Sequence, residues 1–222
     1  RIAQSYDFAT QLSQGYQYDL DESARRMQLN GSERVLDLCC GTGKSTLACL
    51  NQLPNGQIIG VDNSEGMLAE AQARFAAEMQ NGHVKFKLKD AMQLDFPDNS
   101  FDAVFMAYGL RNMPDYEKAI QGIHRVLKPG GKLCIHDYSL SGSLFSKMYW
   151  TVLGYGFIVP FCTLLSGSSR IYTYLVKSVL HFLSPSQMEG LLVANGFEKV
   201  QVAPHASWRK PILYSVIAVK KD

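Results

Sequence analysis

The sequence lacks several features that would assign it to a specialised class of protein. It has almost no net charge, because 20 Asp and Glu side chains balance 22 Lys and Arg, which argues against nucleic acid as a partner. None of the five cysteines forms a Cys-x-x-Cys pair, and an odd number argues against a disulfide framework. Such cysteines are typical of small buried side chains in a reducing compartment, so a cytoplasmic location is expected.

A membrane-spanning segment is also missing. The most apolar stretch lies between Leu144 and Leu165, but two glycines and Pro160 interrupt it, whereas a transmembrane helix needs about 20 consecutive, predominantly apolar residues. No internal repeat is visible. What the chain does have is 46% hydrophobic residues, which is enough for a globular core, so we expect one domain over residues 1–222.

Strand-like and helix-like segments alternate along most of the chain. Strands are predicted at residues 34–40, 57–62, 84–89, 101–108 and 132–137, with helices at 46–53, 64–79 and 116–127 between them. Alternating lysines in the third segment indicate the edge of a sheet. Later helices are predicted at 172–182 and from 184 onward, followed by closing strands at 198–203 and 212–219. This order predicts an α/β fold with a mostly parallel sheet and right-handed crossovers.

Two segments stand apart from this alternation. Residues 1–30 are rich in aromatic side chains at roughly helical spacing and are predicted to form an N-terminal helical cover over the ligand. Residues 142–183 interrupt the pattern with apolar helices and are predicted to form a lid or substrate-binding insertion. Trp and Tyr in this insertion would suit contact with a membrane or a greasy substrate.

The stretch Val35–Gly43, V-L-D-L-C-C-G-T-G, carries the strongest functional signal. A buried strand containing Asp37 runs into Gly41-Thr42-Gly43 and then into a helix. Glycine allows positive φ angles and lacks the Cβ that would block the approach of a ligand to the backbone. In open α/β sheets ligands bind beyond the carboxyl ends of the strands, so the turn predicts a nucleotide-like ligand.

Three ligands compete for this turn. A phosphate-binding loop needs a glycine five residues before Gly43, where Leu38 stands. A dinucleotide fingerprint needs a third glycine, where Thr46 stands, and an NAD-dependent oxidoreductase is further disfavoured because no Tyr-x-x-x-Lys pair is present. The third ligand, S-adenosyl-L-methionine, needs carboxylates and backbone groups near the turn. Asp62 ends the second strand, where it can accept from ribose hydroxyls, and Asp90 ends the third, where it can meet an adenine edge.

Four motifs together resemble the ubiquinone/menaquinone biosynthesis C-methyltransferases, the UbiE-type class I methyltransferases. They are residues 35–43, 96–102 (F-P-D-N-S-F-D), 108–112 (Y-G-L-R-N) and 125–131 (R-V-L-K-P-G-G). The first and last are shared by many methyltransferases, whereas Gly-Leu-Arg-Asn is much more specific to enzymes acting on quinone rings. Weaker matches at Tyr6-Asp7, Tyr172–Ser178 and Gly196-Phe197 extend the resemblance over nearly the whole chain.

The resemblance implies a Rossmann-like three-layer sandwich, with a mostly parallel seven-stranded sheet, an antiparallel last strand and a helical lid. It implies methylation of a ring carbon on a prenylated hydroquinone and predicts no metal site. Taken with the glycine turn and the strand ends, it predicts a cofactor-binding set of Asp37, Gly41, Thr42, Gly43, Asp62, Asn63, Met67, Asp90, Ala91, Met92 and Ala107.

The expected chemistry begins with a proton. A hydroquinone ring carbon becomes a good nucleophile when a neighbouring hydroxyl is deprotonated, and the site must also aim the ring at the methyl group. Arg111 is predicted to stabilise the phenolate and to orient a water that takes the proton, because a guanidinium is not itself a base. The other catalytic candidates are Asn112, His136 and Asp137, and the substrate-binding candidates are Tyr108, Arg111, Tyr172 and Tyr174.

The chain departs from the family pattern mainly on the substrate side. Lys44 stands where an acid is common, and His136–Ser141 replaces the usual Glu-Phe-Ser-Lys-Pro type of ending. Two alternatives therefore stay open: a methyltransferase acting on another lipophilic or specialised-metabolite acceptor, and a non-catalytic cofactor-binding subunit of a lipid-biosynthetic complex. The expected partner is a lipophilic small molecule, while peripheral membrane contact and a homodimer are left open.

Overall fold

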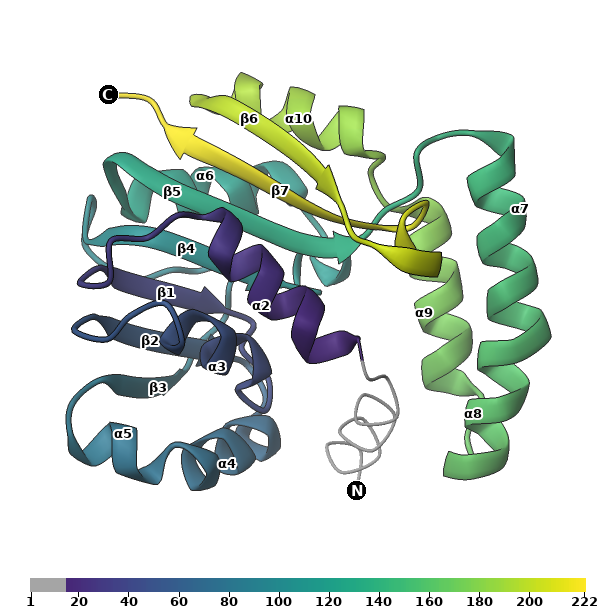
Figure 1. Ribbon diagram of the computed structural model, residues 1–222, viewed down its shortest axis with the longest axis horizontal. Helices are drawn as coiled ribbons and strands as arrows, with labels where there is room; N and C mark the ends of the chain where they lie inside the picture. The colour runs from purple at the N-terminus through teal and green to yellow at the C-terminus, as the bar shows by residue number, and fades with distance from the viewer. Residues whose placement is uncertain (1–14) are drawn as a thin grey trace.

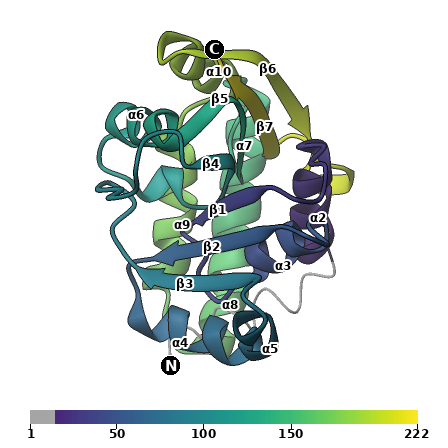
Figure 2. The same ribbon diagram turned by 90° about the vertical axis from the view of Figure 1, so that its left-hand side faces the viewer.

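One seven-stranded sheet organises the molecule, which we describe from a computed structural model covering residues 15–222, apart from the side chains of residues 165 and 207. The strand order is β3-β2-β1-β4-β5-β7-β6 (Figures 1 and 2). The strands are β1 (Arg34–Leu38), β2 (Gln57–Asp62), β3 (Val84–Leu88), β4 (Phe101–Ala107), β5 (Leu127–Tyr138), β6 (Phe197–Pro204) and β7 (Leu213–Lys220). The direction of β7 is opposite to that of the other six strands, which confirms the predicted fold class. The first part of the predicted N-terminal cover, residues 1–14, lies outside the described residues.

Helices cover both faces of the sheet. Helices α2 (Tyr16–Arg26) and α3 (Lys44–Leu50) pack on one face, and α6 (Tyr116–Val126) and α10 (Pro185–Ala194) pack on the other. Helices α4 (Glu65–Arg74) and α5 (Ala76–Gln80) connect β2 to β3. Because side chains of a strand alternate between faces and both faces are covered, the central strands are predominantly apolar, as is typical of parallel sheets.

The lid insertion stands at the carboxyl ends of the parallel strands (Figure 1). It consists of α7 (Leu144–Leu153), a π-helical turn η2 (Gly154–Ile158), α8 (Val159–Ser166) and α9 (Arg170–His181). Trp150 anchors it, because its buried indole packs in a small apolar cluster with Val176 and donates a hydrogen bond to the Val176 carbonyl at 3.1 Å. No helix in the described part of the chain is long and apolar enough to cross a membrane.

Two local predictions were wrong. The helix expected over residues 64–79 divides at Phe75, whose backbone leaves the helical region so that its ring can be buried against Phe86. The strand expected over residues 132–137 is longer at its start, because β5 begins at Leu127 and includes residues 128–131, with a register shift opposite Phe101 and Ala103. The lysine-bearing β3 does form a sheet edge, as predicted.

Candidate active site

The glycine turn joins β1 to α3. Three of its residues have positive φ angles: Cys39 at 62°, Gly41 at 54° and Gly43 at 85°. A Cβ on Gly43 would lie 2.6 Å from a ring carbon of Phe75, whereas a Cβ on Gly41 would meet no atom within 4 Å. Gly43 is therefore required for packing behind the turn, and Gly41 presents its backbone to open space that a ligand can enter.

Asp62 is held against this turn by two backbone amides. The Gly41 amide donates to one carboxylate oxygen at 2.9 Å, and the Ser64 amide donates to the other at 3.0 Å. A carboxylate has about four acceptor positions, so these two bonds leave acceptors for sugar hydroxyls. An amide that already faces a carboxylate is a poor donor to a phosphate, which argues against the phosphate-loop interpretation.

Asp37 lies behind the turn, fully buried. It accepts hydrogen bonds from the Ser45 hydroxyl at 2.8 Å and the Thr46 hydroxyl at 2.6 Å, both in the first turn of α3. Burial raises the pKa of Asp37 to about 7, and the two hydroxyl donors oppose that rise. The carboxyl group therefore ties the strand to the helix that follows the glycine turn.

A pocket over the turn is walled on one side by α2. It is lined by Tyr16, Leu20, Cys39, Cys40, Gly41, Thr42, Lys44, Ser45, Ala107 and Tyr108. The Tyr16 ring stacks on Tyr108 with centroids 5.3 Å apart, and the Gln17 amide donates to the Lys44 carbonyl at 3.2 Å. The structure thus places Gly41, Thr42 and Ala107 of the predicted cofactor set in one pocket with Tyr108, which was predicted to bind the substrate.

The remaining predicted cofactor residues lie at the ends of β2 and β3. Asp90 is exposed and accepts from the Met92 amide at 2.8 Å, with Ala91 half-buried between them. Asn63 is exposed and Met67 is half-buried near the start of α4. A second, more open hollow runs from Asp90 and Met92 toward α6, but the glycine turn does not line it.

Arg111 and Asp137 form a buried ion pair on the face of the sheet that points away from α2. Arg111 lies in the 3-10 helix η1 (Leu110–Asn112) after β4, and its Nε is 3.4 Å from Oδ1 of Asp137 on β5. Their side chains are only 9% and 2% exposed. Burial raises the pKa of Asp137 to about 6, and the charge of Arg111 opposes that rise. The second oxygen, Oδ2, has no hydrogen-bond partner among the residues that the structure describes.

The lid insertion reaches this pair through one tyrosine. The Tyr174 hydroxyl donates to the Asn112 side-chain oxygen at 3.1 Å, and the Asn112 amide donates to the Tyr108 carbonyl at 2.9 Å. Tyr172 is half-buried two residues earlier on α9, and residues two apart do not share a helix face. Of the two predicted lid tyrosines, only Tyr174 is brought to Asn112.

His136 points to the opposite face of the sheet from Asp137. It is completely buried, with Nδ1 2.7 Å from the Ser23 hydroxyl and Nε2 2.8 Å from the Tyr108 hydroxyl. Burial, reinforced by neighbouring cationic groups, lowers the pKa of His136 well below its usual value. Since both ring nitrogens are engaged on the α2 side, the geometry favours Asp137 over His136 for proton removal beside Arg111.

The ubiE/COQ5 methyltransferase family matches residues 1–209 of the sequence. The chain belongs to this family. Among similar proteins, the demethylmenaquinone methyltransferase of Geobacillus stearothermophilus is 37% identical over 184 residues, covering 82% of this chain and 77% of the relative. That of Symbiobacterium thermophilum is 34% identical over 213 residues, covering 89% and 82%.

Solved structures agree with the fold. An S-adenosylmethionine-dependent methyltransferase from Aquifex aeolicus superposes with a TM-score of 0.63 at 18% identity, covering 90% of this chain and 89% of that one. A putative methyltransferase from Bacillus halodurans superposes with a TM-score of 0.64 at 20% identity, covering 92% and 100%. The protein is therefore an S-adenosylmethionine-dependent methyltransferase with a class I fold.

The residues present fit this cofactor. Gly41 faces open space, and Asp62 offers carboxylate acceptors beside it. Asp62, Asp90 and the lining residues Thr42 and Ala107 would hold the cofactor along the ends of β1 to β4. The sequence predicted that residues 1–30 cover the ligand, but it did not single out Tyr16 and Leu20 as lining residues, because aromatic and apolar side chains in a helix are equally typical of core packing.

Proposed function

We propose that this methyltransferase methylates a ring carbon of a prenylated hydroquinone, as the names of the similar demethylmenaquinone methyltransferases suggest. The observation that supports this most directly is the buried Arg111–Asp137 pair at the ends of β4 and β5, beside Asn112 and Tyr174. S-adenosylmethionine would supply an electrophilic methyl group. S-adenosylhomocysteine would leave, and the methylated ring carbon would lose its hydrogen as a proton to restore the aromatic ring. The work left to the protein is to orient the ring and to remove the hydroxyl proton that activates it.

Asp137 and Arg111 divide that work. A phenol has a pKa of about 10, and the pKa of Asp137 is raised to about 6. Moving the proton from phenol to carboxylate is therefore uphill by about 4 pKa units, or about 5 kcal/mol. A guanidinium held in a buried site stabilises the phenolate strongly and lowers this cost. We therefore assign Asp137 as the base and Arg111 as the group that stabilises the phenolate.

The direct test uses the purified protein, reduced short-chain prenylated naphthoquinol under anaerobic conditions, and cofactor with a labelled methyl group. Mass spectrometry should find one labelled methyl on a ring carbon. Label on an oxygen, or on a different phenol when lipid extract is supplied, would instead favour the alternative acceptor class. Arg111→Ala should lower turnover strongly while titration calorimetry shows cofactor binding preserved, and equal loss of both would assign Arg111 a structural role.

We also propose that the lid insertion contacts an anionic lipid surface. Large apolar side chains are exposed on α7, η2 and α8: Leu144, Phe145, Met148, Val152, Tyr155, Phe157, Phe161 and Leu164, the first and last 82% and 83% exposed. Residues 144, 148, 152 and 155 follow a spacing of three and four, so they share one helical face. No Asp or Glu occurs between residues 138 and 188, whereas Lys147, Arg170 and Lys177 do. Exposed apolar and cationic groups together favour anionic membranes.

Vesicle co-sedimentation tests this contact. The protein should bind vesicles containing phosphatidylglycerol more than pure phosphatidylcholine, and the double variant Met148→Ser, Val152→Ser should lose most of that binding. Val193→Ser, an exposed apolar residue on α10, is the matched control and should bind like the parent. If the parent sediments as a dimer that the double variant disrupts, a second copy covers this face and the lipid proposal is wrong.

A further inference from the structure

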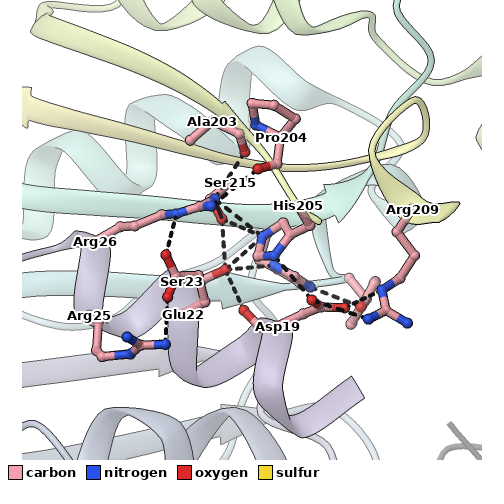
Figure 3. Close-up of polar contacts among 12 residues, drawn as sticks. Asp19, Glu22, Ser23, Arg25, Arg26, Ala203, Pro204, His205, Arg209 and Ser215 are labelled. Atoms are coloured by element: carbon pink, nitrogen blue, oxygen red, sulfur yellow. Dashed lines mark hydrogen bonds and ion pairs between the residues drawn. The ribbon is translucent and has the colours of Figure 1, made fainter. Parts of the chain in front are cut away.

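A chain of buried polar side chains lies beneath α2, outside the Arg111–Asp137 site (Figure 3). It comprises Asp19 and Ser23 from α2, His136 from β5, His205 after β6 and Ser215 from β7, all almost fully buried. We call these five residues the polar clasp. They join helix α2 to three strands that follow it by more than a hundred residues in the sequence.

Ser23 is the centre of the clasp. Its hydroxyl lies 2.7 Å from the Ser215 hydroxyl, 2.7 Å from Nδ1 of His136 and 3.2 Å from Nε2 of His205. His205 in turn lies 2.7 Å from Ser215 through Nε2 and 3.3 Å from the Asp19 carboxylate through Nδ1. Since a carboxylate only accepts, Nδ1 of His205 donates to Asp19.

Two arginines close the clasp at its ends. Arg26 donates to the Ser215 hydroxyl at 3.1 Å and to the Ala203 carbonyl at 3.0 Å (Figure 3). Arg209 lies 2.6 Å from the Asp19 carboxylate, and its guanidinium rests against Gly15 at the start of α2. A Cβ at Gly15 would lie 1.9 Å from that guanidinium, so the absence of a side chain there makes room for Arg209.

The clasp is connected to the pocket over the glycine turn through Tyr108, which contacts His136, and through Tyr16, which lies on α2. The His136 ring reaches the Tyr108 hydroxyl at 2.8 Å, and Tyr108 stacks on Tyr16 from α2. Both tyrosines line the pocket over the glycine turn. Any shift of α2 against β5 and β7 would therefore displace Tyr16 relative to Tyr108 and alter the wall of that pocket.

We propose that the polar clasp positions Tyr16 and Tyr108 for cofactor binding, with Asp19 and Ser23 acting as positioning residues. The proposal rests on the assignment of this pocket to S-adenosylmethionine and not on the identity of the methyl acceptor. Because the clasp is buried, removing one partner leaves others unsatisfied, which typically costs enough to change an equilibrium about tenfold or more. If α2 shifts, the unsatisfied groups can find other partners and part of this free-energy cost is avoided. The same shift displaces Tyr16 and so weakens cofactor binding.

The experiment measures binding of S-adenosylhomocysteine by titration calorimetry, together with amide hydrogen exchange in residues 16–26. Asp19→Asn and Ser23→Ala should each raise the dissociation constant about tenfold and speed exchange in α2. They should also raise the KM for S-adenosylmethionine much more than they lower kcat. Ser139→Ala is the matched control, because it removes a buried hydroxyl (6% exposed) whose bond goes to the Leu183 carbonyl, away from α2.

Gly15→Ala provides a second route that deletes no buried polar group. Its φ of −94° is compatible with alanine, so the change acts through displacement of Arg209. It should weaken binding in the same direction as Asp19→Asn, even if Ser23→Ala does not fold. Variants that lose thermal stability but bind the cofactor like the parent would overturn the proposal. A parent that binds the cofactor but does not methylate the quinol would contradict only the proposed acceptor.

Discussion

Replacement of Asp137 by asparagine should make the protein more stable and less active. The pKa of this buried carboxyl is raised to about 6 from an ordinary value of 3.8. A raised pKa means that the folded state prefers the protonated, neutral form. The protonated carboxyl's contribution to the unfolding free energy is fully present below about pH 4 and is lost as the pH rises through 6. The shift of about 2 units corresponds to about 3 kcal/mol, which already includes the attraction of Arg111 for the ionised form.

Asparagine mimics the neutral form at every pH. Asp137→Asn should therefore match the parent near pH 4 and exceed its unfolding free energy by up to about 3 kcal/mol above pH 7. Turnover should move the other way, because loss of a general base commonly costs about 10² to 10⁴ in rate. The parent's kcat should fall as the pH drops through 6, and the variant's residual activity should lack that limb.

Urea unfolding of both proteins from pH 4 to pH 8 measures the first effect, and turnover under saturating cofactor over pH 5 to 8 measures the second. Arg111→Lys is a useful companion, since it keeps a positive charge near Asp137 but loses the planar guanidinium. If Asp137→Asn is less stable than the parent at pH 8, the assigned cost of burying the ionised Asp137 carboxylate is refuted. Parent activity that is flat across pH 6 would refute its role as the base.

Three further changes address the cofactor side. Asp62→Ala should weaken binding of S-adenosylhomocysteine at least about tenfold by calorimetry, because the turn loses the acceptor for its Gly41 amide. Gly43→Ala should destabilise the fold by more than about 1 kcal/mol in urea unfolding, since φ is 85° and the new Cβ would lie 2.6 Å from Phe75. Thr46→Ala should cost about 1.5 to 3 kcal/mol by the same measurement, because it removes a 2.6 Å bond to the buried Asp37 carboxyl; an unchanged midpoint would show that the bond is compensated.

The cofactor side of the site could be predicted from the sequence because its residues follow the strand ends. Asp62 and Asp90 terminate consecutive parallel strands, and parallel strands bring their carboxyl ends to one edge of the sheet. The alternation of strand and helix patterns predicted the parallel part of the sheet, whereas the antiparallel last strand was implied by the family resemblance. The helix predicted from residue 184 onward is α10, where Ser184 and Gln187 form a capping box. Local rules of this kind need only neighbouring residues.

The polar clasp could not be predicted in that way. Ser23 and Ser215 are separated by 192 positions, and nothing near either residue in the sequence points to the other. In the sequence, a serine, histidine or aspartate of the clasp cannot be distinguished from any other polar residue, because its hydrogen-bond partner is distant in the sequence. The break at Phe75 was missed for a related reason, since the tertiary contact of its ring with Phe86 outweighs the helical pattern around it.

The alternation of side chains along a strand explains why the adjacent residues His136 and Asp137 lie in different sites. His136 and Asp137 are consecutive on β5, so their side chains point to opposite faces. His136 meets Ser23 beneath α2, while Asp137 meets Arg111 on the acceptor side. From sequence alone the two looked like interchangeable candidates for the same proton transfer, and the structure separates them by the thickness of the sheet.

This separation predicts a division of kinetic effects. His136→Asn should raise the KM for S-adenosylmethionine and leave the pH dependence of kcat intact. Asp137→Asn should leave that KM unchanged and abolish the pH dependence of kcat near pH 6. Tyr108 connects both faces, since its hydroxyl meets His136 and its carbonyl accepts from Asn112. The side chains of His136 and Asp137 nevertheless contact different residues on opposite faces of the sheet, so the double variant should be additive within about 0.5 kcal/mol of transition-state free energy. A larger coupling would mean that Tyr108 transmits strain through its backbone, and that the clasp and the base work as one unit.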